Sequence, residues 1–321
     1  MRAAVLVSGI LCATLANGAM GQDYPQKPIR LIIPFAPGGS NDIIGRLLAA
    51  RLTETLGQQV IPDNRAGAGG AIGAEVAARS PPDGYTLVIG HIGTLSVNPT
   101  LYRKLAYNPV TDFAPISTIA KVANIMVVHP SLPANSVREL IALVKQRPGA
   151  LAYGSGGTGG AGHLATEYFK LMAKVDITHV PYKGTGPALV DLIAGQTQLV
   201  FAGAPGIVGH MKSGRLRALG VSTARRLAVF PDVPTIAEAG VPGYEATQWY
   251  GVLAPAGTPA PVVDKLNREI VTWVHTKQLQ DRLVTDGSEP FTTRPEEFLA
   301  FIKSETARWA PVIQSAHITV N

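Results

Sequence analysis

Two segments of the chain have the same succession of a strand pattern, a glycine-rich stretch and a helical pattern. This succession limits the folds that the chain can adopt. Residues 32–48, IIPFAPGGSNDIIGRLL, run from an apolar strand pattern through a glycine pair into a helical pattern, and residues 151–169, LAYGSGGTGGAGHLATEYF, repeat the arrangement. A strand that leads through a short glycine loop into a helix is typical of parallel α/β units. The sequence therefore predicts such units in two separate parts of the chain.

Alternating strand and helix patterns surround both segments. In the first series, strand patterns at residues 29–35, 58–62 and 85–90 alternate with helical patterns at 41–57 and 70–80. The second series begins at residue 124 and ends near residue 222, and two helical stretches, 259–283 and 293–309, follow it. Such alternation implies parallel strands joined by right-handed crossovers. We expect an α/β protein with two mostly parallel sheets, each flanked by helices.

Two stretches without helical periodicity, residues 111–123 and 243–257, are candidates for chain crossings between the two units. If both cross, the first lobe contains residues 22–121 plus 249–321, and the second lobe contains residues 122–248. Two crossings form a hinge, with a ligand cleft between the lobes.

The first residues have the pattern of a secretory signal peptide. Arg2 precedes an apolar run, and the small residues Ala19 and Gly21 precede a cleavage point before Gln22. A membrane anchor is the alternative, but the run is shorter than the roughly 20 residues that cross a bilayer. We expect residues 1–21 to be removed on export.

The amino-acid composition limits the kinds of binding site that the chain can contain. Cys12 is the only cysteine and lies in the predicted signal peptide, so we expect a mature chain without disulfides or thiolate sites. The chain has 28 basic and 22 acidic residues without a basic cluster. This mild positive charge favours small anionic ligands and argues against nucleic acid. The histidines show no metal-ligand spacing, so neither a metal nor another cofactor is expected.

The glycine loops predict an anion site. Glycine allows close approach to a ligand, and the start of the following helix offers unpaired N–H groups and partial positive charge. Ser40 or Asn41 could instead cap the helix, and the second loop could be a flexible connector. The candidate ligand-binding residues of the two loops are Pro37, Gly38, Gly39, Ser40 and Asn41, and Ser155, Gly156, Gly157 and Thr158.

Two further glycine loops are candidates for the same cleft. One is NRAGAGGAIGA, in which Ala66, Gly67, Ala68 and Gly69 lie. The other is YKGTGPALV, where Lys183 is either a ligand contact or a solvated surface lysine. Near the second loop, His163 is predicted in the first helical turn, where it would donate to a ligand or make a local hydrogen bond.

Enzymatic alternatives find little support. The segment GSGGTG matches a dinucleotide-binding pattern, but the strand after its helix, ITHVPYK, lacks the expected acidic residue at its end. Ser155 lacks the glycine two positions earlier that a nucleophile elbow requires, because Tyr153 stands there. We therefore expect no enzyme.

Long segments of the chain resemble a known family. They include YPQKPIRLIIPFAPGGSNDIIGRLLAARL, NRAGAGGAIGAEVAARSPPDGYTLVIG, YGSGGTGGAGHLATEYFK, VPYKGTGPALVDLIAGQTQLVF and FPDVPTIAEAGVPGYEATQWYGVLAPAGTP. In these the chain resembles the substrate-binding proteins of tripartite tricarboxylate transporters, also called Bug receptors. The resemblance covers nearly the whole mature chain and implies a periplasmic binding protein, type II-like, whose lobes close on a small organic acid.

The resemblance also implies roles for particular residues. Backbone amides and small side chains of residues 37–41 and 155–158 would hold a carboxylate, with bridging waters, and residues 66–70 would assist. Residues 93–96, Lys183 with Gly184, and residues 201–203, including Ala202, would surround the distal end of the ligand. Asn41 departs from the family pattern, in which threonine often precedes the aspartate.

Three functions remain open from the sequence. The first is a receptor that delivers the acid to membrane permease subunits, as a monomer and without catalysis. The second is an extracytoplasmic sensor that uses the same cleft to signal to a partner. The third is an exported enzyme. The sequence does not name the acid.

Overall fold

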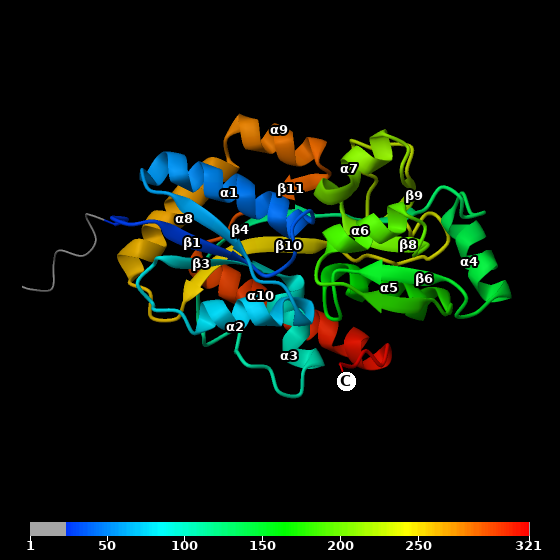
Figure 1. The fold of residues 1–321 in the computed structure, drawn as a ribbon, viewed down its shortest axis with the longest axis horizontal. Helices are drawn as coiled ribbons and strands as arrows, with labels where there is room; N and C mark the ends of the chain where they lie inside the picture. Colours follow the sequence, from blue (N-terminus) through cyan, green and yellow to red (C-terminus); the bar gives the residue numbers. More distant parts are fainter. Residues whose placement is uncertain (1–23, 321) are drawn as a thin grey trace, which may run out of the picture.

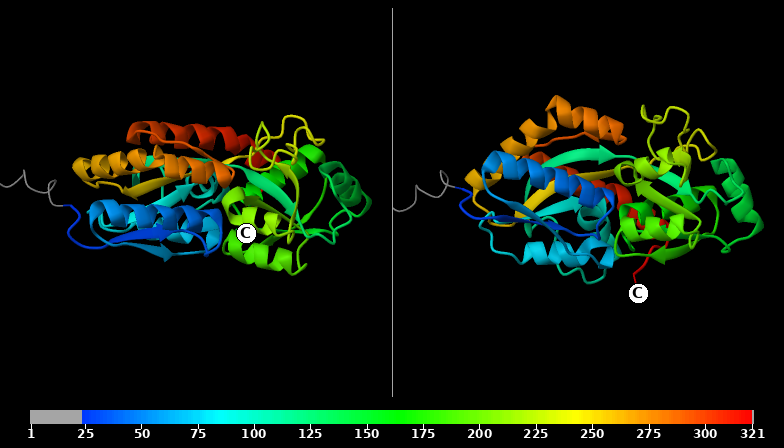
Figure 2. Two further views of the ribbon diagram at one scale, coloured as in Figure 1. Left: turned by 90° about the horizontal axis from the view of Figure 1, so that it is seen from above. Right: turned by 45° about the horizontal axis from the view of Figure 1, so that its top comes forward.

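The computed structural model describes residues 24–320 and places them in two α/β lobes that lie side by side along the long axis (Figures 1 and 2). The predicted signal peptide, residues 1–21 with Cys12, lies outside the described residues. The expected α/β, two-lobed class is confirmed, because helices flank two separate sheets.

The first sheet has six strands in the order β11–β4–β10–β3–β1–β2. Its strands are β1 (Ile29–Ile33), β2 (Val60–Asn64), β3 (Thr86–His91), β4 (Phe113–Val122), β10 (Gln248–Pro255) and β11 (Ser288–Pro290). The accompanying helices are α1 (Ser40–Leu56), the 3₁₀ turn η1 (Ala68–Gly70), α2 (Ala71–Ala78), the π-helical turn η2 (Gly93–Val97), α3 (Asn98–Leu101), α8 (Ala260–Val274), α9 (Lys277–Thr285) and α10 (Pro295–Ser315).

The second sheet has five strands in the order β7–β6–β8–β5–β9. Its strands are β5 (Asn124–Val128), β6 (Ala152–Ser155), β7 (Thr178–Pro181), β8 (Leu199–Gly203) and β9 (Arg217–Val221). Its helices are α4 (Val137–Gln146), α5 (Ala161–Ala173), α6 (Thr185–Ile193) and α7 (Ala204–Lys212).

The expectation of mostly parallel sheets requires a correction, because both sheets are mixed. In the first sheet β1 pairs in parallel with β2 and β3, but β10 runs antiparallel to β3 and β4. In the second, β5 runs antiparallel to both β8 and β9. In the first sheet the crossing segments themselves enter as the strands β4 and β10, and in the second sheet the antiparallel strand is β5, which directly follows the first crossing.

These crossings define the hinge. Only Ala123 separates β4 in the first sheet from β5 in the second, and β10 returns to the first sheet at Gln248, which pairs with Val122. Val122 and Gln248 thus lie in strands of the first sheet, and the lobe bounds expected from the sequence, residues 22–121 with 249–321 and residues 122–248, stay a prediction.

The C-terminal helix ties the lobes together on one side. Helix α10 begins on the first lobe and extends beneath the second (Figure 1). Its buried Trp309 packs edge-on against Tyr168 of α5, with ring centroids 5.7 Å apart, and Trp249 of β10 donates to the carboxylate of Glu305. Large aromatic side chains at the base of the hinge therefore form contacts that connect the two lobes.

Candidate functional site

The first glycine loop lies against the second lobe. The N–H of Ala36 donates to the carbonyl of Lys183 at 3.0 Å, so a backbone hydrogen bond joins the two lobes. A Cβ on Gly184 would stand 2.8 Å from the nitrogen of Ala36, and one on Gly186 would overlap the carbonyl oxygen of Pro37. Here glycine is required because the two backbones touch.

The second glycine loop lies in the same way against the first lobe. A Cβ on Gly69 would overlap the carbonyl oxygen of Thr158, and one on Gly93 would lie 2.7 Å from that of Gly159. The loop around Gly69 is held from behind, because Tyr102 donates its hydroxyl to the carbonyl of Ala68 at 2.9 Å. The glycine-rich loops thus form a closed seam between the lobes.

Within this seam lies a cavity of about 20 Å³, large enough for about one water molecule by volume. Its size shows that the lobes are closed, and its lining comes from both of them. The lining residues are Phe35, Ser40, Asn41, His91, Asn124, Gly156, Gly160, Ala161, Gly162, Thr185, Phe201, Gly203, Gln248 and Tyr250. None of these is a lysine, arginine, aspartate or glutamate.

Four helices of the described chain begin at this cavity. They are α1, α5, α6 and α7, and their N-caps are Gly39, Gly160, Gly184 and Gly203, none of which has a side chain to bond the first turn. Each helix contributes its N-cap or a first-turn residue to the lining. Since a helix N-terminus carries about half a positive charge, four of them create a positive field without a cationic side chain.

Asp42 supports the start of α1 from the side away from the cavity. It accepts hydrogen bonds from the backbone N–H of Gly38, from Arg46 and from Asn64. Burial acts to raise the pKa of this carboxyl, but these hydrogen bonds outweigh it and lower the pKa below 3.8. The carboxylate therefore shapes the first loop and does not line the cavity.

A chain of hydrogen bonds at the hinge orients the polar side chains that close the cavity. Tyr250 donates its hydroxyl to Gln248 Oε1 at 2.6 Å, and Gln248 Nε2 donates to Asn124 Oδ1 at 2.6 Å. Asn124 in turn donates to the carbonyl of Ala246 at 2.7 Å. Because Tyr250 and Gln248 belong to β10 and Asn124 to β5, this chain joins both lobes directly beneath the cavity.

His91 contributes a neutral ring at the end of β3. It is fully buried, and this burial lowers its pKa from 6.5 to about 3. Its Nδ1 accepts the N–H of Thr94 at 3.3 Å, which places the remaining proton on Nε2. The ring therefore adds a hydrogen-bond donor to the cavity and no charge.

Two side chains of the first loop have polar atoms without partners. Ser40 and Asn41 are 4% and 8% exposed, and neither Ser40 Oγ nor Asn41 Oδ1 makes a hydrogen bond within the described residues. Buried polar groups are normally bonded, so these two atoms are available to a ligand or to an ordered water in the cavity.

The polar side chains of the second loop face away from the cavity. Ser155 Oγ lies 2.7 Å from His179 Nε2 and accepts the N–H of Gly157, while His163 Nδ1 accepts the N–H of Gly159. The two histidine rings stack on Tyr153, whose hydroxyl bonds Glu167. Burial lowers the pKa of His163 to about 3 and that of His179 to about 4, so both rings support the loop in neutral form.

The structure brings only part of the predicted set to the cavity. Ser40, Asn41 and Gly156 line it, and Gly39, Gly157, Thr158, Gly184 and residues 67–69 form the seam around it. Pro37, Gly38 and Lys183 are exposed, Ala66 is half-buried, and Ala202 packs in the core of the second lobe. Ser155 and His163 lie behind the loop.

Sequence reasoning missed the side chains that come from strands. Phe35, His91, Asn124, Gln248 and Tyr250 line the cavity but belong to strand ends or to the hinge. For Asn124, Gln248 and Tyr250 the one available signal was their polarity within the apolar strand patterns NIMVV and QWYGVLAP.

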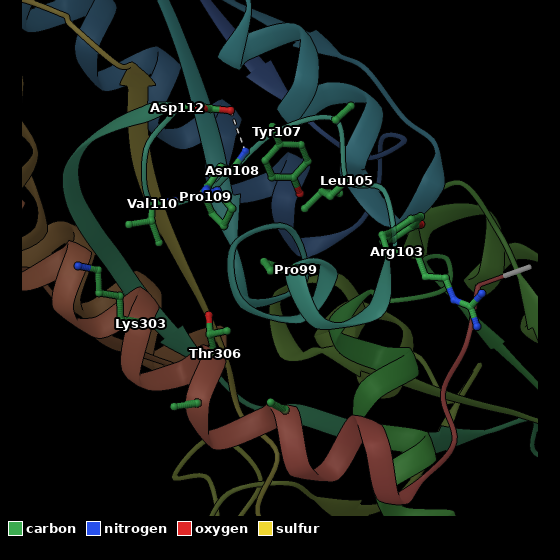
Figure 3. Close-up of a pocket in the computed structure, with 14 residues that line it drawn as sticks. Pro99, Arg103, Leu105, Tyr107, Asn108, Pro109, Val110, Asp112, Lys303 and Thr306 are labelled. Carbon is green, nitrogen blue, oxygen red and sulfur yellow. Dashed lines mark hydrogen bonds between the residues drawn. The ribbon is translucent and has the colours of Figure 1, made fainter.

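A larger groove of about 730 Å³ lies outside the seam, on the first lobe. Figure 3 shows Lys303 and Thr306 on α10 facing the loop that carries Tyr107 and Asn108. The inner side of this loop is polar, since Tyr107 donates to the carbonyl of Thr94 at 2.6 Å. All residues that line this groove belong to the first lobe, whereas both lobes line the cavity in the seam, so we take the seam as the candidate ligand site.

Residues 24–320 contain neither a cluster of metal-binding side chains nor a helix that could span a membrane. No three histidine, cysteine, aspartate or glutamate side chains gather there as a metal ion would require. None of the helices formed by these residues combines the length and apolar character needed to span a bilayer.

Comparison with known proteins decides the family. Residues 44–318 match the Tripartite tricarboxylate transporter family receptor. The chain belongs to this family. Protein BugT of Bordetella pertussis is 39% identical over 311 residues, which cover 96% of this chain and 95% of BugT. A UPF0065 protein of Agrobacterium vitis is 35% identical over 97% of this chain and 91% of its own length. The family consists of periplasmic solute-binding receptors, and the resemblance seen in the sequence is confirmed.

Solved structures agree with the fold. The R. palustris protein Rpa4515, solved with adipate, superimposes with a TM-score of 0.90 at 42% identity, over 92% of this chain and 99% of that one. MatC from Rhodopseudomonas palustris, solved with bound malate, gives 0.85 at 33% identity over 90% of this chain and all of MatC. The periplasmic binding protein BugD gives 0.89 at 34% identity, over 92% of this chain and 99% of BugD.

Proposed function

We propose that this chain is a periplasmic receptor that captures a small organic acid between its lobes and delivers it to the permease of a tripartite transporter. The observation that carries the proposal is the convergence of four glycine-capped helix starts on one cavity without a cationic side chain. Two relatives of known structure hold adipate and malate, which are both carboxylates.

The energies suit reversible capture. A hydrogen bond from a backbone N–H to a carboxylate contributes roughly 1.5–3 kcal/mol net, and a helix dipole adds roughly 0.3–1 kcal/mol. Four or five such contacts, reduced by the cost of association, reach about −8 kcal/mol, which is micromolar affinity. Affinity of this order allows both capture and release, and no charged side chain in the cavity is needed to reach it.

Delivery to a permease rests on the family and on the closed form. The Ala36–Lys183 hydrogen bond and the glycine seam form where the lobes meet, so closure gives the receptor a shape that a membrane partner can recognise. We further propose that residues 1–21 direct export, that the mature chain is a monomer, and that it catalyses no reaction.

The test is a thermal-shift screen of organic acids on the mature chain. An acid present at a hundred times its dissociation constant should stabilise the protein by roughly 2.7 kcal/mol. Uptake of that acid by cells that produce this receptor and a tripartite permease should then require the receptor. Stabilisation by nucleotides or cations with no response to any acid would reject the proposal.

A further inference from the structure

We propose that the cavity selects acids with a hydroxyl group on the carbon next to the carboxylate, and that Asn41 is the residue that recognises this hydroxyl. The inference rests on the proposed function and deepens it, because it names the class of acid. The ligand hydroxyl would donate to the side-chain oxygen of Asn41.

Asn41 presents an acceptor that the closed protein leaves unused. The residue is 8% exposed, its Oδ1 makes no hydrogen bond within residues 24–320, and it lines the cavity between the lobes. No hydrogen bond within that range uses its amide nitrogen either, so the amide offers an acceptor whichever way round it is placed. A ligand that offers only hydrogen-bond acceptors would leave this oxygen unpaired, which is unfavourable in a closed site.

The position of Asn41 places this acceptor beside the carboxylate site. In the first turn of α1, the N–H groups of Asp42 and Ile43 both point to the carbonyl of Gly39, which leaves the N–H groups of Ser40 and Asn41 for a ligand. The backbone of Asn41 would thus hold the carboxylate while its side chain reaches the adjacent carbon. A substituent further along the ligand would face the second lobe instead.

Charge decides between a hydroxyl and an ammonium donor. The lining contains no aspartate or glutamate that could balance an ammonium group, and His91 adds only a neutral ring. Four helix starts make the potential positive, which favours a carboxylate but repels an ammonium group. A neutral hydroxyl is the donor that satisfies Asn41 without this repulsion, so 2-hydroxy acids should be preferred over 2-amino acids.

The experiment is calorimetric titration of the mature chain with matched acids. The pairs are malate and succinate, lactate and propionate, and mandelate and phenylacetate, each hydroxy acid as both enantiomers, with aspartate as the amino counterpart of malate. In the pairs that bind, one enantiomer of the hydroxy acid should bind about tenfold more tightly than the acid without the hydroxyl, and aspartate should bind more weakly than malate. Asn41→Leu should reduce the ratio to within about twofold, mainly by weakening the hydroxy acid.

The matched control is Asn135→Leu, the same substitution at an exposed position before α4 on the second lobe, which should keep the wild-type ratio. Since the ratio in the wild-type protein is itself a test, the inference does not depend on the folding of a variant. Equal affinity for both members of the binding pairs, or tighter binding of aspartate than of malate, overturns the inference but leaves carboxylate capture intact. Binding of no acid at all rejects the proposed function as well.

Discussion

At the scale of single residues, Ser155 illustrates how a side chain can control a site that it does not touch. Its Oγ lies between His179 Nε2 and the N–H of Gly157 and is fully buried. Ser155→Ala leaves both groups unpaired, so we expect a loss of about 1–3 kcal/mol in unfolding free energy and several-fold weaker acid binding. Urea denaturation and calorimetry measure the two effects.

The chain offers a matched control for this change. Ser131 Oγ also lies 2.7 Å from a histidine nitrogen, that of His129, but this pair is exposed. Ser131→Ala should change neither stability, beyond about 0.5 kcal/mol, nor affinity. Equal effects of the two substitutions would contradict the buried support that we assign to Ser155.

Buried histidines predict the response to acid. Burial lowers the pKa values of His91 and His163 from 6.5 to about 3, so between these values the unfolded chain binds more protons than the folded one. Stability must therefore fall as the pH drops below 6.5, by roughly 2 kcal/mol per histidine at pH 5. Melting temperatures at pH 7, 6 and 5 check this, and His91→Gln should make the decline shallower. A melting temperature that does not change between pH 7 and pH 5 would be inconsistent with neutral buried rings.

Residue by residue, the sequence predicted the loops better than the direction of their side chains. The glycines identified the seam because only glycine tolerates such close backbones, and this property is visible in the sequence. The roles of Ser155 and His163 depend on His179, which reaches the loop only through pairing of β6 with β7. Such partners cannot be read from local sequence.

At the scale of elements, the helix starts carry the chemistry, and a charge placed there should separate stability from binding. An aspartate in a first helical turn is favourable, so Asn41→Asp should leave the melting temperature unchanged or slightly raised. The same carboxylate would repel the ligand by several kcal/mol, which predicts at least a hundredfold loss of affinity for acids. Differential scanning calorimetry and isothermal titration calorimetry measure both.

Asn135→Asp provides the comparison, because Asn135 immediately precedes the N-cap Ser136 of α4, away from the cavity. This variant should bind acids like the wild type. If Asn41→Asp also retains wild-type affinity, the carboxylate is not held at the start of α1.

Among the elements, the alternating units were predicted and the inserted strands were not. Apolar periodicity is local, so β1, α1, β2 and their counterparts in the second lobe could be recognised. Helix α7 was missed, because Pro205, Gly206 and Gly209 weaken its helical pattern. Strands β4 and β10 were predicted only as crossings, since their antiparallel pairing joins segments more than a hundred residues apart. With them the sequence analysis missed Gln248 and Tyr250.

For the molecule as a whole, closure depends on backbone contact across the seam, and one glycine tests this directly. Gly186 lies in the first turn of α6, and an added Cβ would overlap the carbonyl oxygen of Pro37 on the other lobe. Alanine suits a helix, so Gly186→Ala should preserve or slightly raise the stability of the second lobe. It should nevertheless hold the lobes apart and weaken acid binding by at least about tenfold, without a larger change in fold by circular dichroism.

The matched control is Gly209→Ala, in α7 of the same lobe, where an added Cβ has nothing within 4 Å. It should give a similar or larger gain in melting temperature with wild-type affinity, because it does not touch the seam. Small-angle scattering with saturating acid provides an independent readout: the wild type and Gly209→Ala should become more compact, whereas Gly186→Ala should remain extended. Full compaction and unchanged affinity of Gly186→Ala would mean that the lobes bind ligand without meeting at this seam, and the closed arrangement would lose its role in capture.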